Sequence, residues 1–446
     1  MRHTKRGSRS PLGLMGVLAL AVTGQAWASG FAIKEQGAVG QGNAGATAGG
    51  EDLSTMFFNP AGLARFSGNQ AQGAMSLIVP SAKFNNRGST DVLGAPLTGG
   101  NGGDAGVGAV VPAIYAMWDH SPDLKLGLAI NAPFGLATSY ATEWAGRYHG
   151  TTSKILNIST QPTAGYRINP WLSIGGGIHV DYTNAELGSA IDFGTVCLAT
   201  VPAATCTALG LLPQRADGDV RLEVDDWSWG FSLGMLIEPR KDLRIGVAYR
   251  SQVSHKLHGT ADFNVPAAAS VLTAGGAVFR DVGANANLTL PESVSFGVAY
   301  DVTPQWTLLA DAAYTRWTRL QELRVRFENP LQPDSVTPED WNSTWFLSLG
   351  ANYKYSDRWT FRAGVAYDQT PVDDQFRTPR LPDQDRLWLA FGVSYNLSDA
   401  LSLDVGYTHI FASPAPIDLN DGQGHRLFGS YDVHIDILSV HARMRF

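Results

Sequence analysis

The chain has 446 residues, of which 16% are charged, and it contains 49 glycines and 12 tryptophans. This charged fraction is low for a soluble protein of its size, and the formal net charge of −7 excludes nucleic acid as a partner. By length alone the chain could form two or three soluble domains. Many small residues combined with many tryptophans are instead typical of a transmembrane barrel.

The first 28 residues have the organisation of a secretory signal peptide. Residues 1–11 hold four basic residues and no acid, residues 12–22 are apolar, and Ala26-Trp27-Ala28 fits a small-residue cleavage site. Cleavage there leaves Ser29 as the first mature residue and a formal charge of −11. The apolar run is too short to span a bilayer, and no later segment approaches the roughly 18 to 20 apolar residues that a spanning helix needs. A position in the membrane would therefore depend on strands.

Residues 29–66 are rich in glycine and alanine and lack the alternation seen further on, which predicts a separate hatch inside a barrel. Near its end, Asn59 is followed by Pro60, Ala61 and Gly62. An asparagine side chain can accept a hydrogen bond from the first turn of a helix, and proline at the first helical position loses no hydrogen bond. Asn59 is therefore expected to begin a helical turn.

Residues 67–446 contain repeated segments in which large apolar and small residues alternate. The clearest is residues 227–237, where odd positions are tryptophan, phenylalanine or aliphatic and even positions are mostly glycine or serine. Residues 359–367, 387–395 and 401–408 repeat the pattern. Only a strand places such neighbours on opposite faces. Alternation alone does not distinguish a soluble sandwich from a barrel whose small residues face inward.

The lengths of the connections favour the barrel. Six short turns alternate strictly with seven longer loops, which predicts 14 antiparallel strands with the short turns on the periplasmic side. The turns are at 119–123, 169–170, 238–242, 301–305, 355–358 and 396–399, and the loops are near 85–104, 134–151, 188–220, 259–284, 328–340, 369–384 and 414–430. Aromatic residues lie close to the short turns, as expected for an interfacial girdle: Trp118, Trp171, Tyr300, Trp306, Trp359 and Tyr395. The sequence therefore predicts an all-β, 14-stranded transmembrane barrel over residues 67–446.

The third predicted strand is interrupted at residues 131–135, Asn-Ala-Pro-Phe-Gly. Proline cannot donate a hydrogen bond to a central ladder, and a following glycine weakens strand pairing further. Either the strand ends at Ile130 and a loop begins, or the barrel wall parts here. The sequence alone leaves both interpretations open.

Three further features concern the outer loops and the chain end. Cys197 and Cys206 lie in one apolar loop and predict a local disulfide worth about 2 to 3 kcal/mol, whereas two cysteines without nearby histidines do not favour a metal site. Arg316, Arg324 and Arg386 are candidates to bind a ligand carboxylate, although surface arginines more often pair with acids or with lipopolysaccharide phosphates. The last strand ends at Phe446. Its apolar residues occupy odd positions at 433, 435 and 437 but even positions from 438 to 446, which indicates a bulge or emergence from the membrane.

Several separate motifs, in order along the mature chain, resemble the FadL/TodX family of outer-membrane transporters for long-chain fatty acids and hydrophobic compounds. They are Ser29-Gly30-Phe31, Phe58-Asn59-Pro60-Ala61-Gly62-Leu63, Phe134-Gly135-Leu136-Ala137-Thr138, Leu290-Pro291-Glu292 and Leu381-Pro382-Asp383-Gln384-Asp385-Arg386.

The resemblance implies passive uptake through a barrel closed by an N-terminal hatch. It implies a first ligand site between the third and fourth outer loops and an interior pocket that includes Phe31, beside a hatch containing Asn59, Pro60 and Ala61. Sideways release is expected at Ala132, Pro133 and Gly135, with Ala109 on the neighbouring strand. Phe446 is expected to be read by the barrel-assembly machinery.

One segment departs from the family pattern. A basic pocket residue is expected soon after the fifth strand, but residues 186–192 contain only acids and small or aliphatic residues. Uptake of aromatic or aliphatic hydrocarbons is therefore the alternative to fatty acids. A lipid hydrolase and a water-filled porin are less favoured, because no serine, histidine and acid trio is legible and a plug precedes the barrel. We expect no enzyme activity, cofactor or metal, and an outer-membrane location in contact with lipid and lipopolysaccharide.

Overall fold

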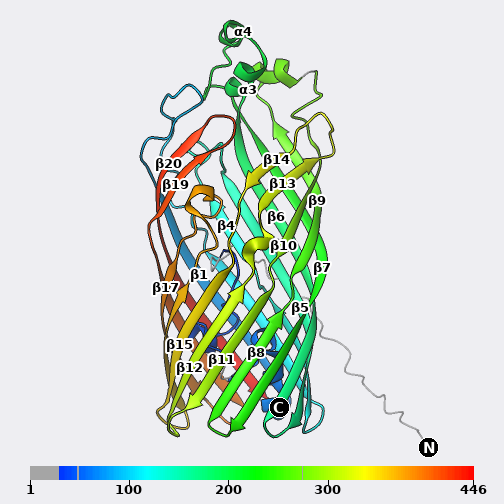
Figure 1. The fold of residues 1–446 in the computed structure, drawn as a ribbon, viewed down its shortest axis with the longest axis vertical. Helices are drawn as coiled ribbons and strands as arrows, with labels where there is room; N and C mark the ends of the chain where they lie inside the picture. The colour runs from blue at the N-terminus through cyan, green and yellow to red at the C-terminus, as the bar shows by residue number, and fades with distance from the viewer. Residues whose placement is uncertain (1–29, 48–49, 274) are drawn as a thin grey trace, which may run out of the picture.

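The computed structural model describes residues 30–47, 50–273 and 275–446, so the predicted signal peptide and Ser29 lie outside the described residues. The chain forms a closed antiparallel barrel of fourteen strands, and six of these are each split into two β-segments (Figure 1). The barrel strands are β1 (Gln70–Asn86), β2 (Ala109–Asp119), β3 (Leu124–Asn131) with β4 (Gly135–Ser139), β5 (Thr152–Asn169), β6 (Leu172–Asp192), β7 (Asp217–Arg240), β8 (Leu243–Arg250) with β9 (Val253–Asn264), β10 (Val282–Leu290) with β11 (Ser293–Asp301), β12 (Trp306–Thr315) with β13 (Glu322–Phe327), β14 (Ser335–Pro338) with β15 (Thr344–Lys354), β16 (Trp359–Asp368), β17 (Arg386–Asn396), β18 (Leu401–Ala412) with β19 (Ala415–Asn420), and β20 (Arg426–Arg445).

The two ends of the sheet close on each other, because β1 pairs with β20 from Gln70 opposite Arg445 to Asn86 opposite Gly429. Closure leaves no exposed sheet edge, which is the condition for a sheet to exist in a bilayer. The fold class, strand number and strand direction predicted from the sequence are confirmed.

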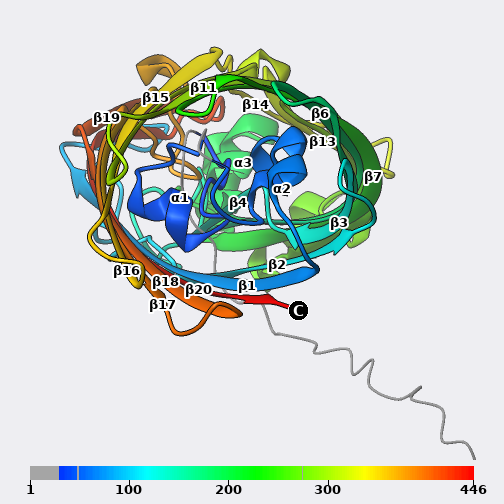
Figure 2. The same cartoon turned by 90° about the horizontal axis from the view of Figure 1, so that it is seen from below.

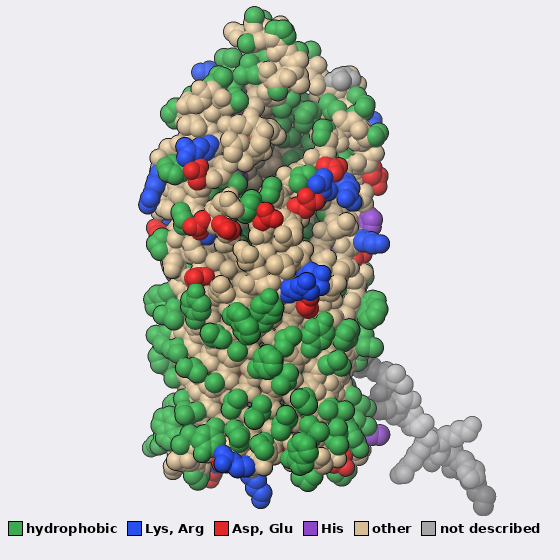
Figure 3. Space-filling view, in the orientation of Figure 1, with side chains coloured by type: hydrophobic (Ala, Val, Ile, Leu, Met, Phe, Trp, Pro, Cys, Tyr) green, Lys and Arg blue, Asp and Glu red, His purple; other side chains and the backbone are tan. Residues whose placement is uncertain are grey.

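The outer face of the lower barrel is apolar, as the alternation predicted. Trp227 and Trp229 are each 66% exposed, whereas Gly230 and Ser232, which follow on the opposite parity, are buried on the lumen side. Exposed apolar side chains of this kind form a band around the barrel that we call the apolar belt (Figure 3). The predicted girdle residues Trp118, Trp171, Tyr300, Trp306 and Trp359 are all exposed beside the short turns.

The parity change in the last strand has a simple origin. The pairing of β20 with β1 runs without a register shift, so there is no bulge. The outward-facing side chains change from apolar at Leu438 and Val440 to acidic at Asp436. Asp436 accepts a hydrogen bond from the Tyr407 hydroxyl and contacts His409. Ile435 and Ile437 are buried inside the barrel. The strand therefore leaves the apolar belt at this point, and the second of the two interpretations is correct.

The N-terminal segment lies inside the barrel, as predicted (Figure 2). It contains α1 (Ala38–Gly42), α2 (Thr55–Phe58) and the 3-10 helix η1 (Pro60–Arg65). As expected, the side chain of Asn59 accepts a hydrogen bond from the Ala61 N–H and so caps η1.

Glycines on the lumen face of the strands let the hatch pack directly against the strand backbone. A Cβ added to Gly392 would lie 2.9 Å from the Cα of Gly42, and one added to Gly165 would lie 2.8 Å from the Cβ of Leu63. The small residues of the strands therefore act as the seat of the hatch.

The outer end carries α3 (Phe193–Thr200), α4 (Ala203–Ala208) and the 3-10 helix η2 (Ala267–Thr273), while the shorter 3-10 helices η3 (Trp317–Arg319) and η4 (Asp374–Phe376) lie lower on the outer half. None of the helices in the described residues combines the length and apolar character needed to cross a membrane.

Candidate ligand site

The start of the hatch is hydrogen-bonded to the interruption in the third barrel strand. Ala32 and Phe134 form an isolated antiparallel bridge. The Ile33 N–H donates to the Pro133 carbonyl at 2.7 Å, and the Gly135 N–H donates to the Phe31 carbonyl at 2.8 Å. The interruption thus exchanges hydrogen bonds with the hatch instead of with a neighbouring strand.

The third strand stops at Asn131 and resumes at Gly135, so it is broken within its length and not at its end. The ladder between β2 and this strand ends at Ile114 opposite Ile130. Beyond that pair, Ala109 on β2 is 1% exposed and Ala132 is 7% exposed, because the hatch covers the break from inside. The Ala132 carbonyl also accepts a hydrogen bond from the Gln36 side chain at 3.0 Å. Ala132, Pro133 and Gly135 therefore lie at a break that the hatch closes, with Ala109 on the adjacent strand β2. A role for these residues in sideways release stays a prediction.

Aromatic rings from four segments meet at the tip of the hatch. Phe31 lies 4.9 Å from Trp317, 5.7 Å from Trp341 and 6.0 Å from Phe134, measured between ring centroids. Trp317 belongs to η3, which enters the barrel between β12 and β13, and it is fully buried. Phe31 was predicted at this site, whereas the two tryptophans were not.

A cavity lies beside this aromatic cluster, between the hatch and the inner wall. Its lining is mainly apolar or small, and includes Ala32, Ile33, Phe57, Phe58, Pro60, Pro133, Phe134, Ala248, Ala312, Ala313 and Phe346. Of the predicted pocket and hatch residues, Pro60 lines this cavity together with Pro133. Asn59, which caps η1, and Ala61 are its neighbours in the chain, and a role for them in ligand binding stays a prediction. The lining suits the tail of a hydrophobic molecule.

Two cations line the same cavity, Lys34 from the hatch and Arg250 from the end of β8. The Lys34 ammonium lies 4.2 Å from the centre of the Phe346 ring, and burial lowers the pKa of Lys34. Arg250 donates to the Gln161 side chain at 2.9 Å and to Ser159 at 3.2 Å, and its guanidinium lies 5.0 Å from the Phe57 ring. Asp311 also lines the cavity, and its charge acts on Lys34. An acidic headgroup would find both beside the apolar lining.

The three arginines predicted from the sequence lie elsewhere. Arg316 is on the outer face, where it pairs with Glu292 at 3.2 Å. Arg324 pairs with Glu322 at 2.6 Å and with Asp334 at 3.1 Å. Buried Arg386 contacts Asp383 and lies 3.7 Å from Asp368. All three already face carboxylates, and a role for them in ligand binding stays a prediction.

The alternation of inward and outward positions along β8 could have predicted that Arg250 faces the lumen. On β8, Arg244, Gly246, Ala248 and Arg250 share the inward parity, while Ile245 and Val247 alternate with them. A charged residue on the small-residue face must enter the lumen. Residues 186–192, expected to follow the fifth strand, instead belong to that strand, β6, and Glu186 there pairs with Arg221 at 3.1 Å.

Asp383 connects the hatch to the loop before β17. Its carboxylate accepts the Gly30 N–H at 3.1 Å and the Thr370 hydroxyl at 2.9 Å, and it also contacts the Arg386 guanidinium. The residue is 1% exposed. A buried carboxylate that holds the first described residue of the hatch fixes the position of Phe31 next to it.

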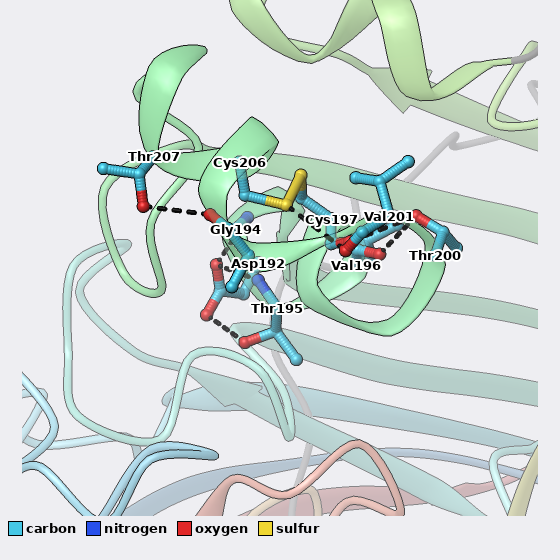
Figure 4. Close-up of a disulfide and its surroundings, with 10 residues drawn as sticks. Asp192, Gly194, Thr195, Val196, Cys197, Thr200, Val201, Cys206 and Thr207 are labelled. Carbon is cyan, nitrogen blue, oxygen red and sulfur yellow. Dashed lines mark hydrogen bonds between the residues drawn. A yellow bond between two sulfur atoms is a disulfide. The ribbon is translucent and has the colours of Figure 1, made fainter.

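The outer loops form a separate apolar cover. The predicted disulfide between Cys197 and Cys206 is present, with a Cα–Cα distance of 5.9 Å, and it joins α3 to α4 (Figure 4). Phe193, both cysteines, Leu211 and Ala269 of η2 form a buried cluster under these helices. The apolar residues predicted in the two loops thus pack on each other over the barrel mouth, while Leu209 and Val271 remain exposed.

A buried histidine ties this cover to the loop before β20. His425 contacts the Asp192 carboxylate at 3.1 Å and the Asp421 carboxylate at 2.5 Å, and its ring stacks on Tyr148 at 4.1 Å. Asp192 also caps α3 by accepting hydrogen bonds from Gly194 and Thr195. Burial disfavours the charged imidazolium, but hydrogen bonds to the two carboxylates outweigh burial and raise the pKa of His425 to about 9.

This ion cluster makes the cover sensitive to alkaline pH. Because the pKa of His425 rises from 6.5 to about 9 on folding, its stabilisation is complete below pH 6.5 and is lost as the pH rises through 9. We expect proteolysis of loop 193–216 to accelerate by more than roughly tenfold between pH 7 and pH 10, normalised to an unstructured peptide. His425→Gln should be cleaved faster at pH 7 and respond little to pH. A parallel pH response in the variant would contradict this role.

Comparison with known proteins agrees with this architecture. Residues 19–446 match the family described as "Outer membrane protein transport protein (OMPP1/FadL/TodX)". The chain is 30% identical over 401 residues to a putative outer membrane protein of Neisseria meningitidis serogroup B, with 86% of each chain covered. It is 28% identical over 424 residues to a long-chain fatty acid transport protein of Escherichia coli O6:H1, with 92% of each covered.

Solved structures show the same fold. A Pseudomonas aeruginosa FadL homologue has a TM-score of 0.85 at 25% identity, with 93% of this chain and 99% of that chain covered. The Ralstonia pickettii toluene transporter TbuX has a TM-score of 0.64 at 20% identity, with 92% and 98% covered, and this similarity concerns the fold alone. The chain therefore belongs to the OMPP1/FadL/TodX family of outer membrane transport proteins.

Proposed function

We propose that the protein takes up long-chain fatty acids or similar amphiphiles across the outer membrane by diffusion, without a nucleotide or other energy source. The observation that carries this proposal is the apolar cavity with Lys34 and Arg250 in its wall, closed by the hatch against a broken strand. An alkyl tail gains about 0.8 kcal/mol per buried methylene, and a carboxylate headgroup gains a cation. The similarity to a long-chain fatty acid transport protein supports the same substrate class.

The proposed path has three stages. The apolar outer loops first bind the ligand, which then enters the cavity beside Phe31. Exit occurs sideways into the membrane, between Ala109 on β2 and the break at residues 132–135, after the hydrogen bonds that join Phe31 and Ile33 to the break are released. A sideways exit keeps the tail out of water, because the ligand passes from an apolar cavity directly into lipid.

Export and assembly complete the proposal. Residues 1–28 direct export and are removed, and Phe446, which is 72% exposed at the end of β20, is read by the barrel-assembly machinery. Lipid and lipopolysaccharide surround the barrel.

The second candidate function is uptake of neutral hydrocarbons by the same path. It is favoured by the lack of a cation between residues 186 and 192 and by the extent of the apolar outer loops.

Arg250 provides the experiment that separates the two functions. In Arg250→Met, we expect binding of a long-chain fatty acid to weaken by about 10- to 100-fold, because a charge-assisted hydrogen bond is lost, while binding of its methyl ester stays unchanged. Equilibrium binding to the purified protein in detergent measures both. Arg244→Met is the matched control, because Arg244 lies on the same strand and parity but binds Asp301 away from the cavity. Equal affinity of acid and ester in the wild type would favour the hydrocarbon function.

A further inference from the structure

A groove opens on the outer face between the eighth and ninth barrel strands, with η3 between it and the ligand cavity. The ladder between β10 and β13 covers only Ala284 to Ala286 opposite Val325 to Phe327. The next backbone hydrogen bond between these strands, from the Arg316 N–H to the Glu292 carbonyl at 3.0 Å, comes only where β11 and β12 begin to pair. The stretch between these points is bridged by η3, and a groove of about 210 Å³ lies outside it.

The two sides of this groove, formed by β10 and β13, carry side chains of different chemistry. On β10, Ala286, Leu288 and Leu290 are buried, so the alternate residues Asn287 and Thr289 face outward. On β13, buried Val325 separates the outward-facing Arg324 and Arg326. One bank therefore presents amide and hydroxyl groups and the other presents guanidinium groups, with Arg319 completing it from η3.

The arginines at the groove outnumber the carboxylates with which they form ion pairs. Arg316 and Arg319 share the Glu292 carboxylate, Arg324 binds Glu322 and Asp334, and the closest carboxylate to Arg326 is Asp334 at 3.9 Å. Four arginines thus face three carboxylates in the described residues. The exposed Lys256 lies in register with Asn287 on the neighbouring strand and adds a further cation. This local excess contrasts with the net negative charge of the chain.

The height of the groove places it at a lipid headgroup. Directly beneath it on β11, Phe296 and Val298 belong to the apolar belt, and the Tyr314–Trp345 ring pair marks the upper rim of the belt on the adjoining strands. Charged side chains gather just above the belt on this face (Figure 3). An aromatic rim with cations above it is the arrangement expected where acyl chains end and headgroups begin.

We propose that this groove binds the phosphorylated headgroup of a glycolipid in the outer leaflet. Arg326, whose nearest carboxylate is 3.9 Å away, can give two parallel hydrogen bonds to a phosphate. Arg319 and Arg324 add positive charge beside it from their pairs with Glu292 and with Glu322 and Asp334, and Asn287 and Thr289 can donate to the sugar or phosphate oxygens. The acyl chains of the same lipid pack on Phe296 and Val298. The inference rests on the outer-membrane position of the proposed function and does not depend on which ligand is transported.

Native mass spectrometry of the full-length mature protein in detergent tests this inference. The probes are a bis-phosphorylated, acylated glucosamine disaccharide and the same lipid without phosphate. We expect the wild type to bind the phosphorylated lipid about tenfold more tightly, and Arg324→Gln combined with Arg326→Gln to remove most of that difference. Arg221→Gln is the matched control, since Arg221 is exposed, paired with Glu186, and on another strand.

The outcomes are separable from those of the transport experiments. The groove variant should keep the wild-type unfolding temperature, whereas Arg250→Met should keep glycolipid binding. Equal binding of the two lipids by the wild type would overturn the inference, as would an equal loss in Arg221→Gln. Loss of fatty acid binding in Arg250→Met with intact glycolipid binding supports both proposals, whereas unchanged fatty acid binding with intact glycolipid binding in the same variant sinks the proposed function only.

Discussion

Replacing Ala132 with arginine is expected to reduce fatty acid uptake by at least about tenfold while the protein still reaches the outer membrane. Ala132 is buried at the strand break, where its carbonyl accepts a hydrogen bond from the hatch residue Gln36. An arginine here fills the space through which an alkyl chain would pass, and it places a charge in the apolar path at a cost of several kcal/mol. Uptake of a labelled long-chain fatty acid by cells that lack the native gene measures the effect.

The same substitution elsewhere in the wall provides the control for Ala132→Arg. Ala415 is equally buried, but it lies at the start of β19 in a continuous ladder with β20. Ala415→Arg should lower stability without lowering uptake per folded molecule. Normal uptake by Ala132→Arg at wild-type surface abundance would rule out sideways exit at this break. An equal loss of uptake in both variants would show that the effect is not specific to the path.

Replacing Asp383 with alanine is expected to release the start of the hatch. The substitution removes the acceptor of the Gly30 N–H and of the Thr370 hydroxyl and leaves Arg386 beside Asp368 alone. Losing one buried hydrogen bond to a charged group costs about 1.5 to 3 kcal/mol. We therefore expect hydrogen exchange at residues 30–33 to accelerate by about 10- to 100-fold. Fatty acid affinity should fall because Ala32, Ile33 and Lys34, which line the cavity next to Phe31, are no longer held in place.

The neighbouring acid gives the matched comparison for Asp383. Asp385 accepts the Thr370 N–H at 2.9 Å and the Tyr367 hydroxyl at 2.6 Å, both within the outer wall. Asp385→Ala should leave exchange at residues 30–33 unchanged. If Asp383→Ala also left it unchanged, the hatch would be held by its contacts with the strand break alone.

The strands were predictable from the sequence because a barrel in lipid imposes strict alternation. Trp227 and Trp229 on one parity and Gly230 and Ser232 on the other fix which face meets lipid. Short turns and long loops then set the strand number and direction. Local rules also sufficed for the η1 cap at Asn59 and for the disulfide between Cys197 and Cys206.

The site was less predictable because it joins segments that are distant in the chain. Lys34 and Arg250 line the same cavity only because the hatch packs inside the barrel. Gly30 donates a hydrogen bond to Asp383, which lies 353 positions further along the chain. Parity could have warned that Arg324 faces outward, since it alternates with buried Val325. Parity could not have revealed Trp317, because η3 interrupts the strand and turns that side chain inward.

The glycine seat of the hatch also bears on what the outer membrane keeps out. Gly42 and Gly392 contact each other without a side chain between them, so α1 packs directly against the barrel wall. A larger residue at either position would force α1 away from the wall. Under the proposed sideways release, α1 can stay in place while the ligand leaves through the wall. The proposed path would then admit hydrophobic nutrients without opening a water-filled channel through the barrel.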